Sequence, residues 1–301
     1  MNFLAFNKMF PDEKAVIDHF ITIRYPKGLR CNHCGSERTS RYTNRPKFYQ
    51  CNDCNNTSSV FKDTIFENTT TDLRKWMYAI HMFLNGKKGI SGLQLQREIG
   101  VTYKTAWRML KQIRKAMGNS DTKKTFEAIV EIDETYIGGK PRKRNKRDDD
   151  DDTPKLKRGR GTKKQPVVGV VDREKGKVHA RVALPNKDGK KLTGKQLLQI
   201  LNEVTKENAI VMTDEFRSYN ILEKKSNYYR LVVDHTKMFA DGIVHTNNVE
   251  SFWAILKRGI YGIYHHVSTK YLQNYVNELC FRFNNRQNKN MFDLVLRQAI
   301  L

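Results

Sequence analysis

The chain has 301 residues, with 55 Lys or Arg against 32 Asp or Glu, so its formal net charge at pH 7 is +23. A protein this basic is typical of those that bind a polyanion, and nucleic acid is a better candidate than an anionic membrane surface. No apolar run approaches the roughly 18–20 residues that span a bilayer, and the N-terminus lacks the pattern of a secretion signal. We therefore expect a cytoplasmic protein without a membrane segment.

Residues 1–28 repeat apolar positions at helical spacing, which predicts a short helical lead-in. Two C-x2-C pairs follow, separated by sixteen residues: Cys31, Cys34, Cys51 and Cys54. Each pair directs two thiolates at one point, and four thiolates complete a tetrahedral zinc site. Tight pairs of this kind suit a reducing compartment and metal ligation better than disulfides. We therefore predict a zinc ribbon with a structural Zn2+ over residues 29–66.

Residues 67–120 read as helical, and two of the expected helices are joined by a turn at Gly100. The second helix begins near Tyr103 and carries basic side chains among apolar ones: Lys104, Arg108, Lys111 and Arg114. This pattern predicts a helix-turn-helix whose second helix enters a DNA groove. The alternative is an ordinary basic helical hairpin that packs on its neighbours.

From residue 126 to residue 301 the expected order of elements is strand, strand, strand, helix, strand, helix, strand, helix. This is the order of the ribonuclease H-like fold, in which the first strand lies beside the fourth. The whole chain is then a mixed α/β protein with a zinc ribbon, a helical region and a ribonuclease H-like domain. The stretch 141–164 has charge runs of both signs and almost no apolar residue, so we expect a disordered charged loop.

Acidic residues follow two of the strands expected in this domain. Asp133 is expected to end the first strand and Asp214 to end the fourth, so the topology brings the two carboxylates side by side. Glu250 lies at the start of a later helix, and Lys257 lies two turns further along the same face. Asn247 is a rival third ligand. Strand-end capping and a favourable charge at a helix N-terminus are the structural alternatives for these acids.

Three carboxylates of this kind suit divalent cations that take oxygen ligands, Mg2+ or Mn2+. Two such ions, roughly 3.5–4 Å apart, can hold the attacking and leaving oxygens of a phosphodiester. In this reading Lys257, Arg258 and His245 contact DNA phosphates. A solvated basic face is the alternative for the two cations.

Several stretches resemble the bacterial insertion-sequence DDE transposases that carry an N-terminal zinc ribbon, the IS1595 group with ISXO2-like transposases. The matching stretches are "CNHCG", "YQCNDC", "IVEIDETYIGGK", "VMTDEFRSY" and "HTNNVESFWAILKRGIYGIYHH". The resemblance implies that Asp133 and Asp214 are the first two acidic positions of the site. It also implies that the third position is Asn247 or Glu250, accompanied by Lys257.

The resemblance further implies an enzyme that binds terminal inverted repeats, cleaves DNA and joins a 3′-hydroxyl to target DNA in a bacterial, nucleoid-associated setting. Because two element ends are joined, we expect a homodimer or a larger assembly on DNA. The alternative is a catalytically inactive, domesticated DNA-binding regulator. The intact set of Asp133, Asp214 and Glu250 argues against a regulator, since a protein without catalysis has no need for converging carboxylates in a basic groove.

Overall fold

The computed structural model describes residues 2–86, 88–118, 125–138, 164–185, 192–233 and 245–300. Its residues form two compact units, the first made of residues 1–120 with 287–301 and the second of residues 121–286. The charged loop predicted at 141–164 lies outside the described residues except for Lys164. None of the described helices is both long and apolar enough to cross a membrane.

The first unit begins with two helices, α1 (Phe3–Met9) and α2 (Glu13–Arg24). Asp12 caps α2 by accepting a hydrogen bond from the Ala15 amide at 2.7 Å, which satisfies one of the free N–H groups of its first turn. A three-stranded antiparallel sheet follows, made of β1 (Thr39–Arg41), β2 (Phe48–Cys51) and β3 (Thr57–Ser59) in that order. The helical lead-in and the ribbon thus follow one another along the chain in the predicted order.

Three further helices complete most of this unit: α3 (Leu73–Asn85), α4 (Gly92–Ile99) and α5 (Tyr103–Met117). Helix α4 ends at Gly100, whose φ of +60° lies in the left-handed region that glycine adopts without strain. Thr102 then caps α5 by accepting a hydrogen bond from the Thr105 amide at 3.2 Å. The short turn between α4 and α5 matches the predicted helix-turn-helix.

The last helix, α10 (Met291–Gln298), belongs to the first unit, although the sequence had placed residues 126–301 in one domain. Val295 and Leu296 of α10 are fully buried, and the Ile65 amide donates to the Ala299 carbonyl at 2.9 Å. The predicted C-terminal boundary of the second domain is therefore too late. Helical periodicity identified this segment as a helix but carries no information about which core it joins.

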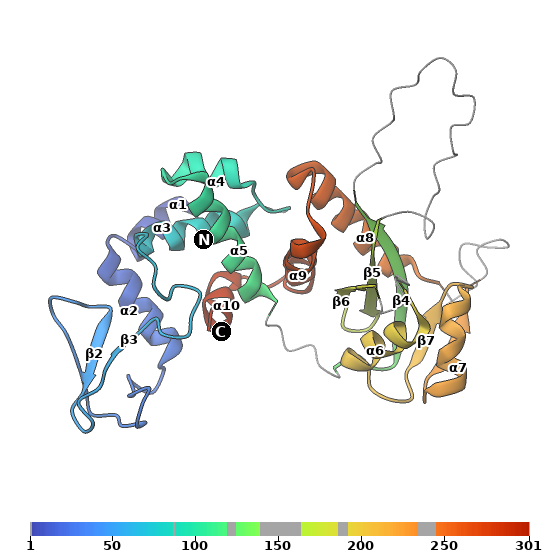
Figure 1. Cartoon of the computed structure of the whole chain (residues 1–301), viewed down its shortest axis with the longest axis horizontal. Helices are drawn as coiled ribbons and strands as arrows, with labels where there is room; N and C mark the ends of the chain where they lie inside the picture. Colours follow the sequence, from blue (N-terminus) through green and yellow to red (C-terminus); the bar gives the residue numbers. More distant parts are fainter. Residues whose placement is uncertain are drawn as a thin grey trace, which may run out of the picture. The chain divides into compact units, whose positions relative to one another are not determined.

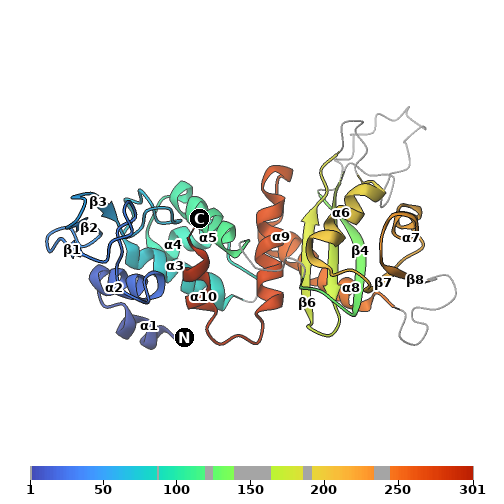
Figure 2. The ribbon, with the colours of Figure 1, turned by 90° about the horizontal axis from the view of Figure 1, so that it is seen from below.

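The second unit contains a five-stranded sheet in the order β6-β5-β4-β7-β8 (Figure 1 and Figure 2). Its strands are β4 (Ile129–Ile137), β5 (Gln165–Asp172), β6 (Lys177–Val182), β7 (Ile210–Thr213) and β8 (Tyr229–Val232). Strands β4, β5 and β6 pair antiparallel, and β7 and β8 run parallel to β4. The first strand of the unit thus lies beside the fourth, as predicted, and this is the ribonuclease H-like strand order.

Helices cover both faces of this sheet. On one face, α6 (Gly194–Val204), the 3-10 turn η2 (Arg217–Asn220) and α7 (Ile221–Lys225) follow the connections to β7 and β8. On the other lie α8 (Asn247–Gly259), a π-helical turn η3 (Ile260–Tyr264) and α9 (Thr269–Asn284), and α9 packs along β6 (Figure 2). Each face has its own buried cluster, because successive strand side chains alternate between the two faces.

Helix α8 packs closely on the sheet at Gly169 of β5. A Cβ atom added there would lie 2.6 Å from Cη2 and 2.8 Å from Cζ2 of Trp253, and 3.3 Å from a methyl group of Val249. Glycine inside a strand weakens the strand unless another group needs the space. Here the space is filled by the indole ring of Trp253.

We predict that Gly169→Ala lowers the free energy of unfolding by about 1–3 kcal/mol, because the new methyl group overlaps a packed ring. Urea unfolding of the purified protein measures this change. Gly262→Ala in η3 is the matched control, since its added Cβ would meet nothing within 4 Å. Equal stability of the two variants would contradict the tight packing of Trp253 on β5.

Candidate active site and metal centre

The four predicted zinc ligands meet at one point in the first unit. One ligand atom from each of Cys31, Cys34, Cys51 and Cys54 lies within 4.8 Å of the other three. The Sγ atoms of Cys31 and Cys54 are 3.6 Å apart, as are those of Cys34 and Cys51. Residues with positive φ, Gly35 (+76°) and Asn55 (+57°), close the two turns immediately after the second cysteine of each pair.

The backbone of these turns favours thiolate, which is the form of cysteine that binds metal. Hydrogen bonds from the backbone at Cys34 and His33 lower the pKa of the Cys31 thiol to about 6. Four convergent sulfur ligands of this kind fit a tetrahedral Zn2+ ion and leave no ligand position open for substrate. The donor set therefore indicates a structural metal.

In the second unit, Asp133 lies on β4, and Asp214 immediately follows β7, the parallel neighbour of β4. The last pair in the register is Glu131 with Met212, and each aspartate lies two residues further along the chain from its member of that pair. Adjacent strands are about 5 Å apart, so the two carboxylates begin from neighbouring backbone positions. The Phe216 amide donates to Oδ1 of Asp214 at 3.0 Å, which fixes that carboxylate at the strand end.

Asp133 does not end its strand, which corrects one detail of the sequence interpretation. Strand β4 continues to Ile137 because Glu134–Ile137 remain paired with β5 on the antiparallel side. The parallel partner β7 ends at Thr213. Asp133 therefore stands where β4 loses its pairing with β7 and keeps its pairing with β5.

The surroundings of Asp133 oppose its ionisation. Burial raises the pKa of this carboxyl group to about 7, and the nearby charges of Glu134 and Asp214 add to the rise. A hydrogen bond of 2.9 Å from Nε1 of Trp253 to Oδ2 acts in the opposite direction. A buried acid beside two other acids is the environment in which a bound cation gains most, because the cation removes the repulsion among them.

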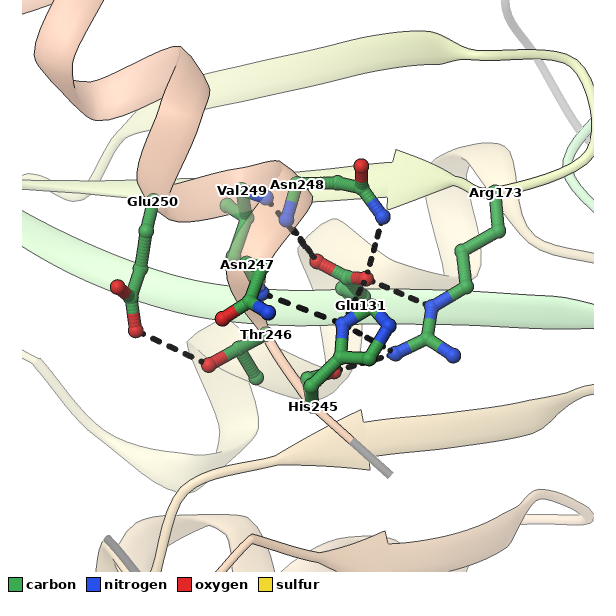
Figure 3. Close-up of polar contacts among 8 residues, drawn as sticks. All are labelled: Glu131, Arg173, His245, Thr246, Asn247, Asn248, Val249 and Glu250. Carbon is green, nitrogen blue, oxygen red and sulfur yellow. Dashed lines mark hydrogen bonds and ion pairs between the residues drawn. The ribbon is translucent and has the colours of Figure 1, made fainter. Parts of the chain in front are cut away.

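The N-terminus of α8 is attached to the same strand through a buried carboxylate that the sequence had not singled out. Glu131 is fully buried and accepts hydrogen bonds from the amides of Asn248 and Val249, at 2.9 and 3.0 Å. It also accepts from Nδ2 of Asn248 at 2.8 Å and from Nε of Arg173 at 2.6 Å. Figure 3 shows these donors converging on Glu131 from α8 and from the end of β5.

The two rival third ligands lie in the first turn of α8. Asn247 and Glu250 are both exposed, and Oε1 of Glu250 accepts a hydrogen bond of 3.2 Å from the hydroxyl of Thr246. In Figure 3 the side chain of Glu250 points away from Glu131. Its position in the first helical turn also allows the simple role of a favourable charge at a helix N-terminus.

Among the described residues, the four cysteines are the one group of three or more His, Cys, Asp or Glu placed to hold a metal ion. Asp133, Asp214 and Glu250 do not form such a group as their side chains lie in this structure.

Lys257 of α8 lies beside the continuation of β4. A surface pocket there is lined by Glu134, Thr135, Tyr136, Lys164, Lys257 and Tyr261. Oε2 of Glu134 accepts a hydrogen bond of 2.9 Å from the hydroxyl of Tyr219, which is buried in the opposite cluster. The pocket brings the predicted phosphate-binding lysine next to the residue that follows Asp133.

The residues predicted to contact DNA are placed differently by the structure. Lys104 and Arg108 of α5 are exposed and Lys111 is half-buried, whereas Arg258 is exposed on α8. Arg114 is 2 % exposed and its guanidinium stacks over the ring of Phe83, so its prediction as a surface contact is wrong. Its place in the basic pattern of α5 did not reveal that its position faces the core.

His245 also differs from its expected role as a phosphate contact. Its Nδ1 atom lies 3.0 Å from Nη2 of Arg173 and 3.4 Å from Oε1 of Glu131, and its carbonyl accepts a hydrogen bond from Arg173. His245 therefore belongs to the polar cluster around Glu131. The sequence offers one signal for this cluster: Glu131 lies two residues before Asp133 and so on the same face of the strand. It does not show that this face is buried.

A zinc ribbon followed by helices and a ribonuclease H-like sheet with paired acids defines the class of this protein. An ISXO2-like transposase domain matches residues 125–284, and a transposase zinc-ribbon domain matches residues 11–57. The chain therefore belongs to the family of ISXO2-like transposases that carry this zinc ribbon. The predicted family is thereby confirmed.

Two curated relatives are similar to the chain. An uncharacterized protein in transposable element ISH50 of Halobacterium salinarum is 30% identical over 257 residues, which cover 83% of this chain and 84% of the relative. An uncharacterized transposase-like protein of Haemophilus influenzae is 31% identical over 104 residues, which cover 35% of this chain and 82% of the relative. The first name refers to a transposable element and the second to a likeness to transposases.

The solved structures that match include a Mos1 transposase paired-end complex with left transposon end and a pre-cleavage Mos1 transpososome. Each match covers 74% of this chain and 78% of the solved one, with a TM-score of 0.29 and 13% or 12% sequence identity. At this level of similarity the assignment of the fold rests on the strand order described above.

We predict that Cys31→Ser releases zinc, because the site loses one of four ligands and the remaining three do not close it. Elemental analysis of purified protein measures the zinc content directly. Cys280→Ser is the matched control, since Cys280 lies on α9 in the other unit. Full zinc occupancy in Cys31→Ser would contradict the assignment.

Proposed function

We propose that the chain is an active transposase that cleaves the ends of its own element and joins them to target DNA. The observation that supports the proposal is the parallel register of β4 and β7, whose last pair, Glu131 with Met212, lies two residues before Asp133 and Asp214 respectively. The third ligand comes from the first turn of α8, from Asn247 or Glu250. A regulator without catalysis would gain nothing from an acid such as Asp133, whose pKa is raised to about 7 by burial and by two neighbouring acids.

The oxygen ligands of this site fit Mg2+ or Mn2+. Two such ions would stabilise the charge that develops on the attacking and leaving oxygens of a phosphodiester. The protein's own groups would orient the ligands: Trp253 through its N–H to Asp133, and Phe216 through its amide to Asp214. Lys257 would bind a phosphate of the strand beside Asp133.

The first unit would recognise the terminal inverted repeats. Lys104, Arg108 and Lys111 follow one another at helical spacing on α5, which suits contact with a phosphate backbone along a groove. The formal charge of +23 supports a polyanionic partner. Because transposition joins two ends, a homodimer or larger assembly on DNA is part of the proposal.

We expect Asp133→Asn to abolish cleavage, because it removes a metal ligand while adding no bulk. The assay combines purified protein, labelled DNA from both flanks of the coding sequence and Mg2+ or Mn2+, and scores nicked and joined products. Affinity for the same DNA should stay within about twofold, since one buried carboxylate contributes little to phosphate binding. Glu223→Gln, which removes an exposed acid paired with Arg230, should cleave normally. Cleavage by Asp133→Asn at the wild-type rate would refute the proposed site.

We expect Lys104→Ala and Arg108→Ala to weaken binding to element ends. Each lost phosphate contact should lower the slope of log affinity against log salt by about 0.9. Filter binding at several salt concentrations measures the slope. Lys8→Ala, which removes an exposed charge from α1, is the control for loss of net charge alone. Equal slopes for all three variants would remove α5 from the DNA interface.

A further inference from the structure

Glu131 is a fully buried carboxylate of the second unit, and it lies two residues from Asp133 on the same face of β4. Four N–H groups donate to it at 2.6–3.0 Å: two amides and one side-chain nitrogen from the first turn of α8, and the Nε of Arg173. None of its surface is exposed. It therefore links the strand that carries Asp133 to the helix that carries the rival third ligands.

The number of donors excludes Glu131 itself as a metal ligand. An ionised carboxylate has about four acceptor positions on its two oxygens, and four N–H groups take them. Arg173, whose side chain is 12% exposed, supplies the opposite charge. A cation would have to displace Arg173 or uncover the helix end, and both changes would leave buried groups without partners.

The contacts fix both the position and the rotation of α8. The consecutive amides of Asn248 and Val249 belong to the first helical turn, where N–H groups have no acceptor within the helix. Both donate to the carboxylate of Glu131, which therefore holds the helix end along its axis. The side chain of Asn248 adds a contact off the axis. Asn247 and Glu250 are neighbours of these residues in the same turn, so their place relative to Asp133 depends on Glu131.

We propose that Glu131 is a positioning residue for the catalytic metals: its buried carboxylate, balanced by Arg173, holds the N-terminus of α8 so that the third ligand faces Asp133 and Asp214. This inference rests on the proposed function. A helix that slides by one turn moves by 5.4 Å, which exceeds the spacing between two ions in a paired site. The hydrogen bond from Trp253 to Asp133 lies in the second turn of α8. By itself it would leave the first turn free to fray.

Glu131→Gln tests the inference. Glutamine has the same shape, but its amide nitrogen is a donor and faces other donors, so two of the four bonds are lost or become repulsive. Loss of a group that orients metal ligands typically costs 10–100-fold in metal affinity or activity. We expect the Mn2+ concentration for half-maximal cleavage to rise by roughly that factor, with most of the rate recovered at saturating Mn2+. DNA affinity should stay unchanged.

A second measurement does not depend on catalysis. In protein without metal or DNA, Glu131→Gln should accelerate hydrogen exchange at the first turn of α8, where the amides of Asn248 and Val249 lose their acceptor. Exchange in β6, which lies away from this contact in the sheet order, should stay near that of the wild type. Thermal unfolding establishes that the variant is folded before either comparison is made.

Glu278→Gln is the matched control. Glu278 on α9 is also fully buried in the second unit, and it accepts hydrogen bonds from Nε of Arg282 at 3.0 Å and from the hydroxyl of Tyr264. This variant should lose stability as Glu131→Gln does and keep the Mn2+ dependence of the wild type. The comparison separates loss of a buried charge pair from loss of the attachment of α8.

Two results would overturn the inference. One is a folded Glu131→Gln protein with the Mn2+ dependence and the exchange of the wild type. The other is a protein as inactive as Asp133→Asn at every Mn2+ concentration with normal exchange in α8, which would make Glu131 a ligand. If Glu131→Gln does not fold, Asn248→Ala removes one of the four bonds from an exposed position and should shift the Mn2+ dependence in the same direction. Cleavage by Asp133→Asn would instead refute the proposed function, whatever the exchange data show.

Discussion

The attachment of α8 to β4 is the constraint on which the rest of the candidate site depends. Strand β4 supplies Asp133 and Glu131, and Asp214 follows β7, the parallel neighbour of β4. In the proposed site the third ligand comes from a helix far along the chain, and this helix has to be held against β4. Glu131 holds the helix end and Trp253 holds its second turn, with Gly169 providing the space for the indole ring.

This way of holding a helix favours position over stability. Removing a carboxylate and a guanidinium from water is costly, and a packed apolar pair of similar volume is often as stable or more stable. An apolar contact tolerates sliding, whereas a carboxylate that accepts two consecutive helix amides does not. Asp133 is held at a similar cost, since its raised pKa shows that the fold keeps this acid in surroundings that oppose its charge. Both features sacrifice folding energy at a site where ligands have to converge.

The sequence predicted what depends on local patterns and on strand order. Cysteine spacing was enough for the zinc ribbon, and the alternation of strands and helices was enough to place β4 beside β7. It could not predict Glu131, because an acid in a strand normally marks a face exposed to solvent and only the docked helix shows that this face is buried. The burial of Arg114 was missed for a related reason. A basic residue among other basic residues of a helix is expected at the surface, and only the packed structure places its guanidinium over the ring of Phe83.

The return of α10 to the first unit shows the same limit on a larger scale. Its apolar positions predict a helix, but the choice of core is made by contacts with α2, α3 and α5, which lie more than 170 residues earlier in the chain. The residues after α10 also pair with the segment that follows the ribbon, through the bridge between Thr64 and Ile300. The second unit is therefore an insertion within the first, entered after α5 and left after α9. The core that supports the ribbon and the helix-turn-helix is complete only once the last residues of the chain have joined it.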